Sequence, residues 1–91
     1  MDRNDAETYN WRGISKYSLG DYEGAIADYD QAVKLKSDFA DAYYNRGVSK
    51  YNLGDYEGAI ADYDQAIELK SDYAEAYNNR GSSKDSLGEY K

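Results

Sequence analysis

Two pairs of aspartates are the residues of this chain whose spacing comes closest to a reactive site. One residue separates the members of each pair, Asp28 from Asp30 and Asp62 from Asp64. Two carboxylates that converge on one point could act as general acid and base or hold a metal ion. On a helix, residues two apart point to different faces, so neither pair is expected to converge. The pairs therefore predict solvated helix faces and not a catalytic or metal site.

The chain lacks several of the side chains that enzymes most often use in catalysis. The 91 residues include no cysteine, histidine or proline. Disulfides, thiolate nucleophiles, zinc–thiolate sites and imidazole acid–base chemistry are therefore excluded. The segment 28–39 lacks the ligand order and central glycine of a calcium loop, and the glycines are not arranged as a phosphate loop. We expect no enzyme activity, no metal ion and no cofactor.

The charge of the chain argues against two classes of partner. Its formal net charge is −7, with 18 acidic and 11 basic side chains. Binding to a phosphate backbone depends largely on Lys and Arg, so no nucleic acid partner is expected. No apolar run approaches the roughly 20 residues that a membrane span needs, and the first residues contain no signal-peptide core. We expect a soluble chain with no membrane partner, cytoplasmic by default.

The elements that carry these residues follow from an internal repeat. When the sequence is shifted by 34 residues, segment 12–45 matches segment 46–79 at 27 of 34 positions. The block LGDYEGAIADYDQA occurs unchanged at 19–32 and 53–66. A fixed period of this length is typical of one supersecondary unit that stacks on copies of itself. This architecture favours a binding surface over an enzyme.

Helix signals within each period predict a hairpin of two helices. Gly54 follows one helix as a left-handed stop, and Asp55 begins the next as an N-cap. The second helix then carries apolar residues at spacings of three and four, which form one stripe. In the second period this stripe comprises Tyr56, Ala59, Ile60, Tyr63, Ala66 and Ile67. Because Leu, Ile, Val and Phe number only 12, the 12 tyrosines must supply much of the core volume.

The predicted organisation is all-α, with five helices in two and a half hairpins. A tail over 1–5 precedes repeats over 6–39 and 40–73, and a partial third repeat covers 74–91. If Asp38 and Asp72 cap the helices that follow them, Asp41 and Glu75 stand three positions on, where a capping box has its partner, although Asp in place of Ser or Thr makes this a loose match.

The positions of these residues resemble the tetratricopeptide repeat, a 34-residue helix–turn–helix unit. The second period reads Tyr43-x2-Arg46-Gly47-x2-Lys50 and then Ala59-x3-Tyr63-x2-Ala66. The family pattern has Leu and Tyr where all units of this chain have Arg and Lys. It ends in Pro, where this chain has Ser37 and Ser71. The resemblance implies antiparallel hairpins stacked as a short right-handed α-solenoid.

The arginines that replace the family leucine recur at Arg12, Arg46 and Arg80. We expect a structural role, in which the stem lines the hairpin and the guanidinium pairs with an aspartate such as Asp28 or Asp62. The alternative is a row of arginines that binds an anionic ligand.

The resemblance also implies a function, the presentation of a groove to a peptide or a partner helix. Tyr rings offer contact area at low entropic cost, and Asn amides can pair with an extended backbone. Carried over by position, the groove residues are Asn10, Trp11, Ile14, Tyr17, Asp41, Tyr44, Asn45, Val48, Tyr51, Asn52, Glu75, Asn78 and Asn79, with Ser82 and Asp85 beside them. Trp11 is either a groove anchor or a cover for the first helix.

One groove type of this family, the clamp for the acidic C-terminal tail of chaperones, is not expected. At its five positions the chain has Asn10, Ile14, Asn45, Glu75 and Asn79, of which only Asn45 matches. Glu75 would repel an acidic ligand. Acidic residues recur once per repeat at Glu7, Asp41 and Glu75; they indicate either an acidic lip for neutral or basic partners or simple complements of helix N-termini.

A purely structural role is the competing hypothesis. The near-identity of the repeats suits a self-stacking or consensus-like unit without a dedicated ligand. The third unit lacks its second helix in this sequence, so its open face could associate head-to-tail with the first helix of another copy.

Overall fold

The computed structural model describes residues 5–88, which contain five α-helices and no strand. The helices are α1 (Ala6–Ser18), α2 (Tyr22–Leu35), α3 (Ala40–Asn52), α4 (Tyr56–Leu69) and α5 (Ala74–Ser86). The all-α class expected from the sequence is confirmed. None of the helices in the described part of the chain combines the length and the apolar character needed to cross a membrane.

The turn inside each hairpin forms as its sequence predicts. Gly20 and Gly54 have φ values of 84° and 85°, in the left-handed region that glycine adopts without a steric penalty. Asp21 and Asp55 then cap α2 and α4. Their carboxylates accept hydrogen bonds from the backbone N–H of Gly24 and Gly58, at 2.9 and 3.0 Å. These bonds satisfy one of the N–H groups that a helix start leaves without a partner.

The capping of α3 and α5 differs from the sequence prediction. The N-cap positions are held by Phe39 and Tyr73, and neither helix start has a side-chain cap. Asp38 and Asp72 are therefore not caps, and Asp41 does not act as a capping-box partner. Tyr73 is buried instead, and its hydroxyl donates a 2.7 Å hydrogen bond to Asp41. Packing of an aromatic ring at the turn has replaced polar capping.

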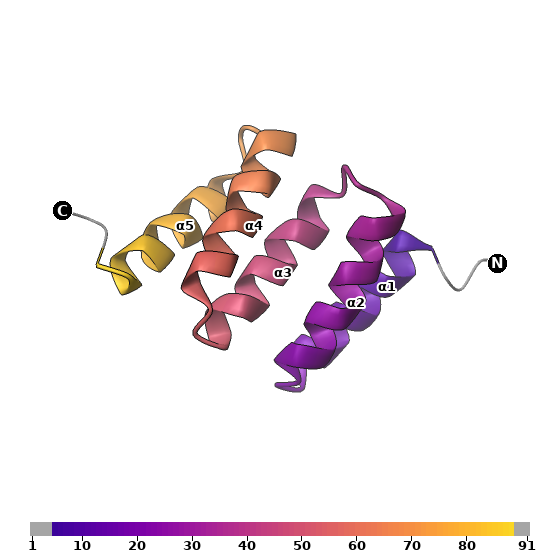
Figure 1. Cartoon of the computed structure of the whole chain (residues 1–91). Helices are drawn as coiled ribbons and strands as arrows, with labels where there is room; N and C mark the ends of the chain where they lie inside the picture. The colour runs from indigo at the N-terminus through magenta and orange to yellow at the C-terminus, as the bar shows by residue number, and fades with distance from the viewer. Residues whose placement is uncertain (1–4, 89–91) are drawn as a thin grey trace.

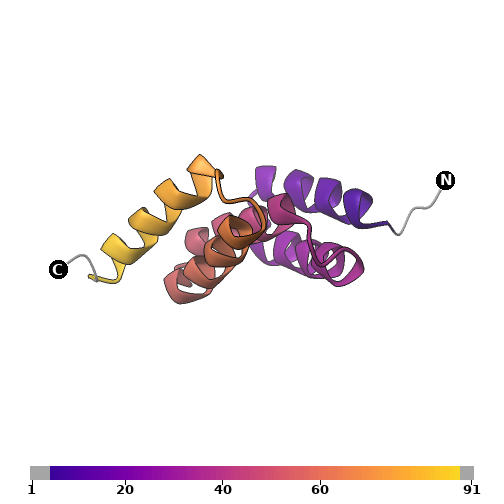
Figure 2. The ribbon, with the colours of Figure 1, turned by 90° about the horizontal axis from the view of Figure 1, so that it is seen from above.

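The helices stack as hairpins along one direction. α1 packs against α2 and α3 against α4, while α2 contacts α3 and α4 contacts α5. Figure 1 shows the hairpins side by side with the two termini at opposite ends, and in Figure 2 α1 and α2 form the two layers of the first hairpin. The molecule is elongated, with principal extents of 49 × 28 × 17 Å. This is the stacked arrangement of a short solenoid.

The core consists of tyrosine rings set among alanines and glycines. Tyr29 and Tyr63 are each only 1% exposed. Each ring lies on a glycine of the facing helix: a Cβ added at Gly13 would be 2.4 Å from Tyr29 Cε1, and one at Gly47 would be 2.7 Å from Tyr63 Cε1. Real side chains do not approach this closely, so only glycine admits the ring at either position. The tyrosines thus provide the core volume that the scarce aliphatic residues cannot.

Candidate functional site

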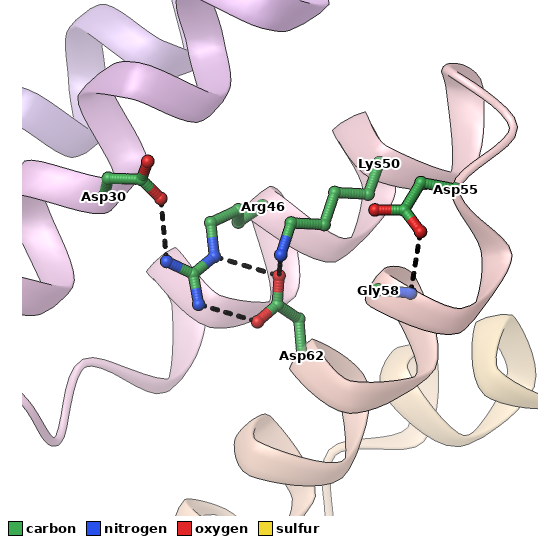
Figure 3. Close-up of polar contacts among 6 residues, drawn as sticks. All are labelled: Asp30, Arg46, Lys50, Asp55, Gly58 and Asp62. Atoms are coloured by element: carbon green, nitrogen blue, oxygen red, sulfur yellow. Dashed lines mark hydrogen bonds and ion pairs between the residues drawn. The ribbon is translucent and has the colours of Figure 1, made fainter.

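The two aspartates of each pair point to different helices, as their spacing predicts. Arg46 of α3 lies between Asp62 of α4 and Asp30 of α2 (Figure 3). Its Nε and Nη2 donate to the two oxygens of Asp62 at 2.9 and 2.8 Å, and its Nη1 donates to Asp30 at 2.8 Å. Lys50 Nζ is 3.1 Å from Asp62. Asp62 therefore binds inside its own hairpin, whereas Asp30 joins its hairpin to the next.

The pairing with aspartates predicted for the arginine row is confirmed. Arg12 pairs with Asp28 at 3.2 Å and Arg80 pairs with Asp64 at 2.7 Å. The three guanidinium groups also lie 5.2 to 5.4 Å from the ring centres of Tyr9, Tyr43 and Tyr77. The hydrogen bonds that Arg46 donates to Asp62 raise the pKa of Arg46 above its ordinary value despite burial. Carboxylates of the chain thus already hold the charges that an anionic ligand would use.

Two neighbouring pockets lie on the side of the molecule formed by the first helix of each hairpin. The first has a volume of about 260 Å³ and is lined by Tyr17, Val48, Tyr51, Asn52, Tyr63, Asn79 and Ser82. The second has a volume of about 270 Å³ and is lined by Ile14, Tyr17, Tyr29, Tyr44, Asn45 and Val48. Tyr17 and Val48 line both, so we treat the two pockets as one groove along α1, α3 and α5.

The predicted site residues divide between this groove and its surroundings. Eight line the pockets: Ile14, Tyr17, Tyr44, Asn45, Val48, Tyr51, Asn52 and Asn79. Five do not: Asn10, Trp11, Asp41, Glu75 and Asn78. Of these, Asp41 accepts the Tyr73 hydroxyl, and Trp11 is 69% exposed on α1.

The floor of the groove includes Tyr29 and Tyr63, which sequence reasoning placed only in the core. Each ring is almost fully buried, yet it also lines a pocket. The sequence does carry a signal for this. The glycines at Gly13 and Gly47 remove side chains from the facing helix, so the tyrosine rings can reach through the hairpin toward the groove.

A ladder of side-chain hydrogen bonds joins the helices that line the groove. Asn45 donates to the Asn10 amide oxygen at 3.1 Å, and Asn79 donates to the Tyr44 hydroxyl at 3.0 Å. Asn52 donates to the Tyr17 hydroxyl at 3.1 Å. In each case the partners are 35 residues apart, one repeat plus one residue. These bonds hold the side chains that line the groove in fixed positions.

Burial of the tyrosine rings shifts their ionisation upward. Burial raises the pKa of Tyr29 to about 12, and it raises the pKa of Tyr63 as well. For Tyr73, burial and the hydrogen bond to Asp41 both raise the pKa. All three rings are therefore held neutral in the folded chain at a pH where exposed tyrosines ionise.

We expect the chain to unfold cooperatively at alkaline pH. A tyrosine of the unfolded chain ionises near pH 10, whereas folded Tyr29 ionises near pH 12. Below pH 10 both states are protonated and stability is complete. From pH 10 to 12 the unfolded state loses protons that the folded state keeps. Each such tyrosine therefore lowers the free energy of unfolding by about 1.4 kcal/mol per pH unit. Urea melts between pH 8 and 12 measure this slope.

Tyrosinate absorbance provides the check on this expectation. The buried tyrosines should ionise together with the loss of helical circular dichroism. If all tyrosines ionise near pH 10 while the helices persist, the buried rings do not have raised pKa values and the expectation is wrong.

The family is established by its sequence pattern on this fold. The family model described as TPR repeat matches residues 15–54 and 49–88, most of the chain. The chain belongs to the tetratricopeptide repeat family. No curated protein sequence matches it significantly. In this TPR chain no three acidic side chains of residues 5–88 come together as a metal site would require.

Solved TPR structures share the fold of this TPR chain. The crystal structure of MamA is 28% identical with a TM-score of 0.93, covering 97% of this chain and 48% of that protein. The second TPR domain of Spaghetti (RPAP3), bound to the HSP90 peptide SRMEEVD, is 31% identical with a TM-score of 0.90, covering 91% of this chain and 77% of that one. The TPR2B domain of yeast Sti1, in a complex named pHsp70, is 27% identical with a TM-score of 0.91, covering 93% and 68%. The chain spans about half the length of MamA.

Proposed function

We propose that this TPR chain is a protein-interaction module, without catalytic activity, that binds a peptide segment or a partner helix in the groove. The observation that carries the proposal is the pair of pockets joined through Tyr17 and Val48. Their aromatic, aliphatic and amide lining provides apolar contact area and backbone hydrogen bonding together, as peptide sites require. The peptide complexes of RPAP3 and Sti1 support the same use of the fold.

The two pockets suit different parts of one ligand. Ile14, Tyr29 and Val48 make the second pocket suited to an apolar side chain. Asn52, Asn79 and Ser82 place amides and a hydroxyl at the first, where an extended backbone can pair with them. Asn79 donates to the Tyr44 hydroxyl and also hydrogen-bonds to Tyr63, which holds its amide in place at this pocket.

Charge favours a neutral or basic ligand. Burial raises the pKa of Tyr44 at the groove, and the negative charge of Glu75 adds to this effect. A carboxylate that acts on a groove tyrosine would also act on a bound ligand. With a net charge of −7, the chain attracts basic segments and repels acidic ones.

We further propose that the groove does not take an acidic tail such as the peptide SRMEEVD bound by RPAP3. A clamp for such a tail needs cations at the groove, and this chain has Asn10, Glu75 and Asn79 at the three positions where the clamp has cations. Arg12, Arg46 and Arg80 are paired with aspartates on the hairpins. The acidic peptide would therefore meet repulsion and no compensating cation.

A peptide-display selection against the folded chain tests this function. We expect enrichment of neutral or basic segments with an apolar residue, weakened by salt because the attraction is partly electrostatic. Labelled SRMEEVD and an analogue with lysines at its three acidic positions should differ, with only the lysine form bound. Tight binding of SRMEEVD would contradict the proposed charge preference.

A pair of variants locates the binding site. Ser82→Trp fills the first pocket from an exposed position on α5 and is expected to reduce peptide affinity about tenfold or more. Ala61→Trp, at an exposed position of α4 outside both pockets, is the matched control and should bind normally. Equal affinities for the two variants would place the ligand elsewhere.

The alternative is a structural repeat without a dedicated ligand. The hydrogen-bond ladder favours this alternative, because amides at the groove already bond to side chains of neighbouring hairpins. A selection that enriches no peptide above background would leave this alternative in place and reject the groove as a ligand site.

A further inference from the structure

The first pocket of the groove is lined by tyrosine rings from three different helices. They are Tyr17 of α1, Tyr51 of α3 and Tyr63 of α4. The Tyr17 and Tyr51 rings each contact a tyrosine at the start of the next helix, with centroids 5.3 Å from Tyr22 and 5.2 Å from Tyr56. The face of an aromatic ring carries partial negative charge and attracts a cation. Three rings around a volume of about 260 Å³ therefore favour a cationic group.

The Asn52 amide beside these rings can offer a ligand an acceptor but no donor. Its nitrogen donates to the Tyr17 hydroxyl at 3.1 Å and to the Val48 carbonyl oxygen at 2.8 Å, which occupies both of its N–H bonds. Within residues 5–88 no donor binds the carbonyl oxygen of this amide. The Ser82 and tyrosine hydroxyls can rotate to accept as well. The first pocket thus suits a ligand that donates hydrogen bonds.

The cations of the chain do not occupy this part of the groove. Among residues 5–88, no Lys or Arg belongs to the lining of either pocket. On α3, Arg46 and Lys50 pair with Asp62 inside the hairpin, at 2.8 and 3.1 Å. At the second pocket, burial raises the pKa of Tyr44 and the charge of Glu75 raises it further, so a carboxylate acts on the groove. A cation that enters the groove meets attraction and no like charge.

We propose that the first pocket binds the guanidinium group of an arginine in the bound peptide, stacked among the three tyrosine rings and donating to the Asn52 carbonyl oxygen. This assignment rests on the proposed function, because it names the side chain that the groove selects. A guanidinium is planar, has several N–H donors and is more weakly hydrated than an ammonium, so arginine suits the rings better than lysine does. The second pocket then takes a neighbouring apolar side chain.

N-acetylarginine methylamide is the probe for this pocket, and the citrulline counterpart is its matched control. Citrulline has nearly the shape of arginine but carries a neutral urea group. In a titration of the full chain followed by two-dimensional NMR, the arginine compound should shift the Asn52 side-chain amide and the Ser82 backbone amide in a saturable way. Its own side-chain protons should move upfield, because they lie near aromatic rings. The citrulline compound should bind at least about fivefold more weakly.

Ser82→Asp tests the pocket by a gain of affinity. Ser82 is exposed on α5 and lines the pocket, so the new carboxylate would lie near the guanidinium without disturbing the core. We expect the arginine compound to bind about threefold more tightly or better, and the affinity of the citrulline compound to stay unchanged. Ala61→Asp adds the same charge at an exposed position of α4 outside both pockets and should change neither affinity.

Two variants of Tyr51 test the contribution of a ring. Tyr51→Phe keeps the ring and should retain most of the affinity for the arginine compound. Tyr51→Leu keeps an apolar side chain without a ring and should weaken that affinity about fivefold, with little effect on the citrulline compound. Circular dichroism and urea melts establish that both variants are folded. Equal affinities of the two variants for the arginine compound would show that the Tyr51 ring does not contact the cation.

Three results would overturn the assignment of the pocket to arginine. They are equal affinities for the arginine and citrulline compounds, NMR shifts confined to residues outside the first pocket, and an unchanged arginine affinity in Ser82→Asp.

Peptides from the display selection separate this failure from a failure of the proposed function. If citrulline can replace arginine in them without loss of affinity, while Ser82→Trp still prevents binding, the groove binds peptides but does not select arginine. If no peptide is enriched and the arginine compound still binds more tightly than citrulline in the first pocket, the selectivity is upheld and the peptide function is wrong.

Discussion

Tyr63→Ala is expected to lower the free energy of unfolding by about 3–5 kcal/mol, the range for removing a large buried aromatic side chain. The ring is 1% exposed, fills the space above Gly47 and lies 5.8 Å from the Tyr44 ring. Domains have only about 0.05–0.15 kcal/mol of stability per residue, so most of the stability of this chain should be lost. Urea denaturation followed by circular dichroism measures the change.

Two variants control for the loss of an aromatic ring as such. Tyr63→Phe keeps the ring over Gly47 and should preserve most of the stability. Tyr77→Ala removes a ring that is 43% exposed and should cost about 1 kcal/mol or less. A Tyr63→Ala variant that is no less stable than Tyr77→Ala would show that the glycine-tyrosine contact does not support the hairpin.

Arg46→Ala is expected to destabilise the chain by about 3 kcal/mol, toward the lower end of what breaking a buried ion pair costs. The Arg46 side chain is 17% exposed and that of Asp62 5%, so Asp62 would keep only Lys50 as a partner. The change also removes the link to Asp30 of the preceding hairpin. Thermal and urea unfolding should both report the loss.

Arg12 provides the matched comparison within the same chain. Its side chain is 55% exposed and, among residues 5–88, forms an ion pair with Asp28 and none with a second aspartate, so Arg12→Ala should cost about 1 kcal/mol or less. Arg46→Lys keeps the charge but cannot form the paired N–H bonds to Asp62, and it should fall between the two. Equal losses for Arg12→Ala and Arg46→Ala would mean that neither the burial of the pair with Asp62 nor the bridge to Asp30 adds stability.

Local signals in the sequence were sufficient to predict the helices. Gly54 and Asp55 are a stop and a cap that act through neighbouring backbone groups, and they work in isolation from the rest of the fold. The starts of α3 and α5 could not be read in this way. There the aromatic residues Phe39 and Tyr73 take the cap positions because they pack against other helices, and such packing is not a local property.

The candidate site was only partly accessible to the same reasoning. Positions on the first helix of each hairpin follow from the repeat, so residues such as Tyr17 and Val48 could be named in advance. The pairing of Asn10 with Asn45 depends on the offset between neighbouring hairpins, which no single repeat contains. Tyr63 is both a core residue and a residue that lines the groove. This depends on how far its ring extends past Gly47 toward the groove, which the sequence does not give.

The single doubly paired arginine has a consequence for how this kind of chain scales with length. Among residues 5–88, Arg46 reaches aspartates on both neighbouring second helices, while Arg12 and Arg80 each reach one. An array of this repeat therefore behaves as a one-dimensional Ising chain, in which each interface between neighbouring hairpins adds to the stability. A hairpin at either end of the array lacks one of these interfaces. Each added hairpin turns one end arginine into an interior one. Cooperativity should thus rise faster than length in short arrays and approach proportionality only when the ends become a small part of the whole.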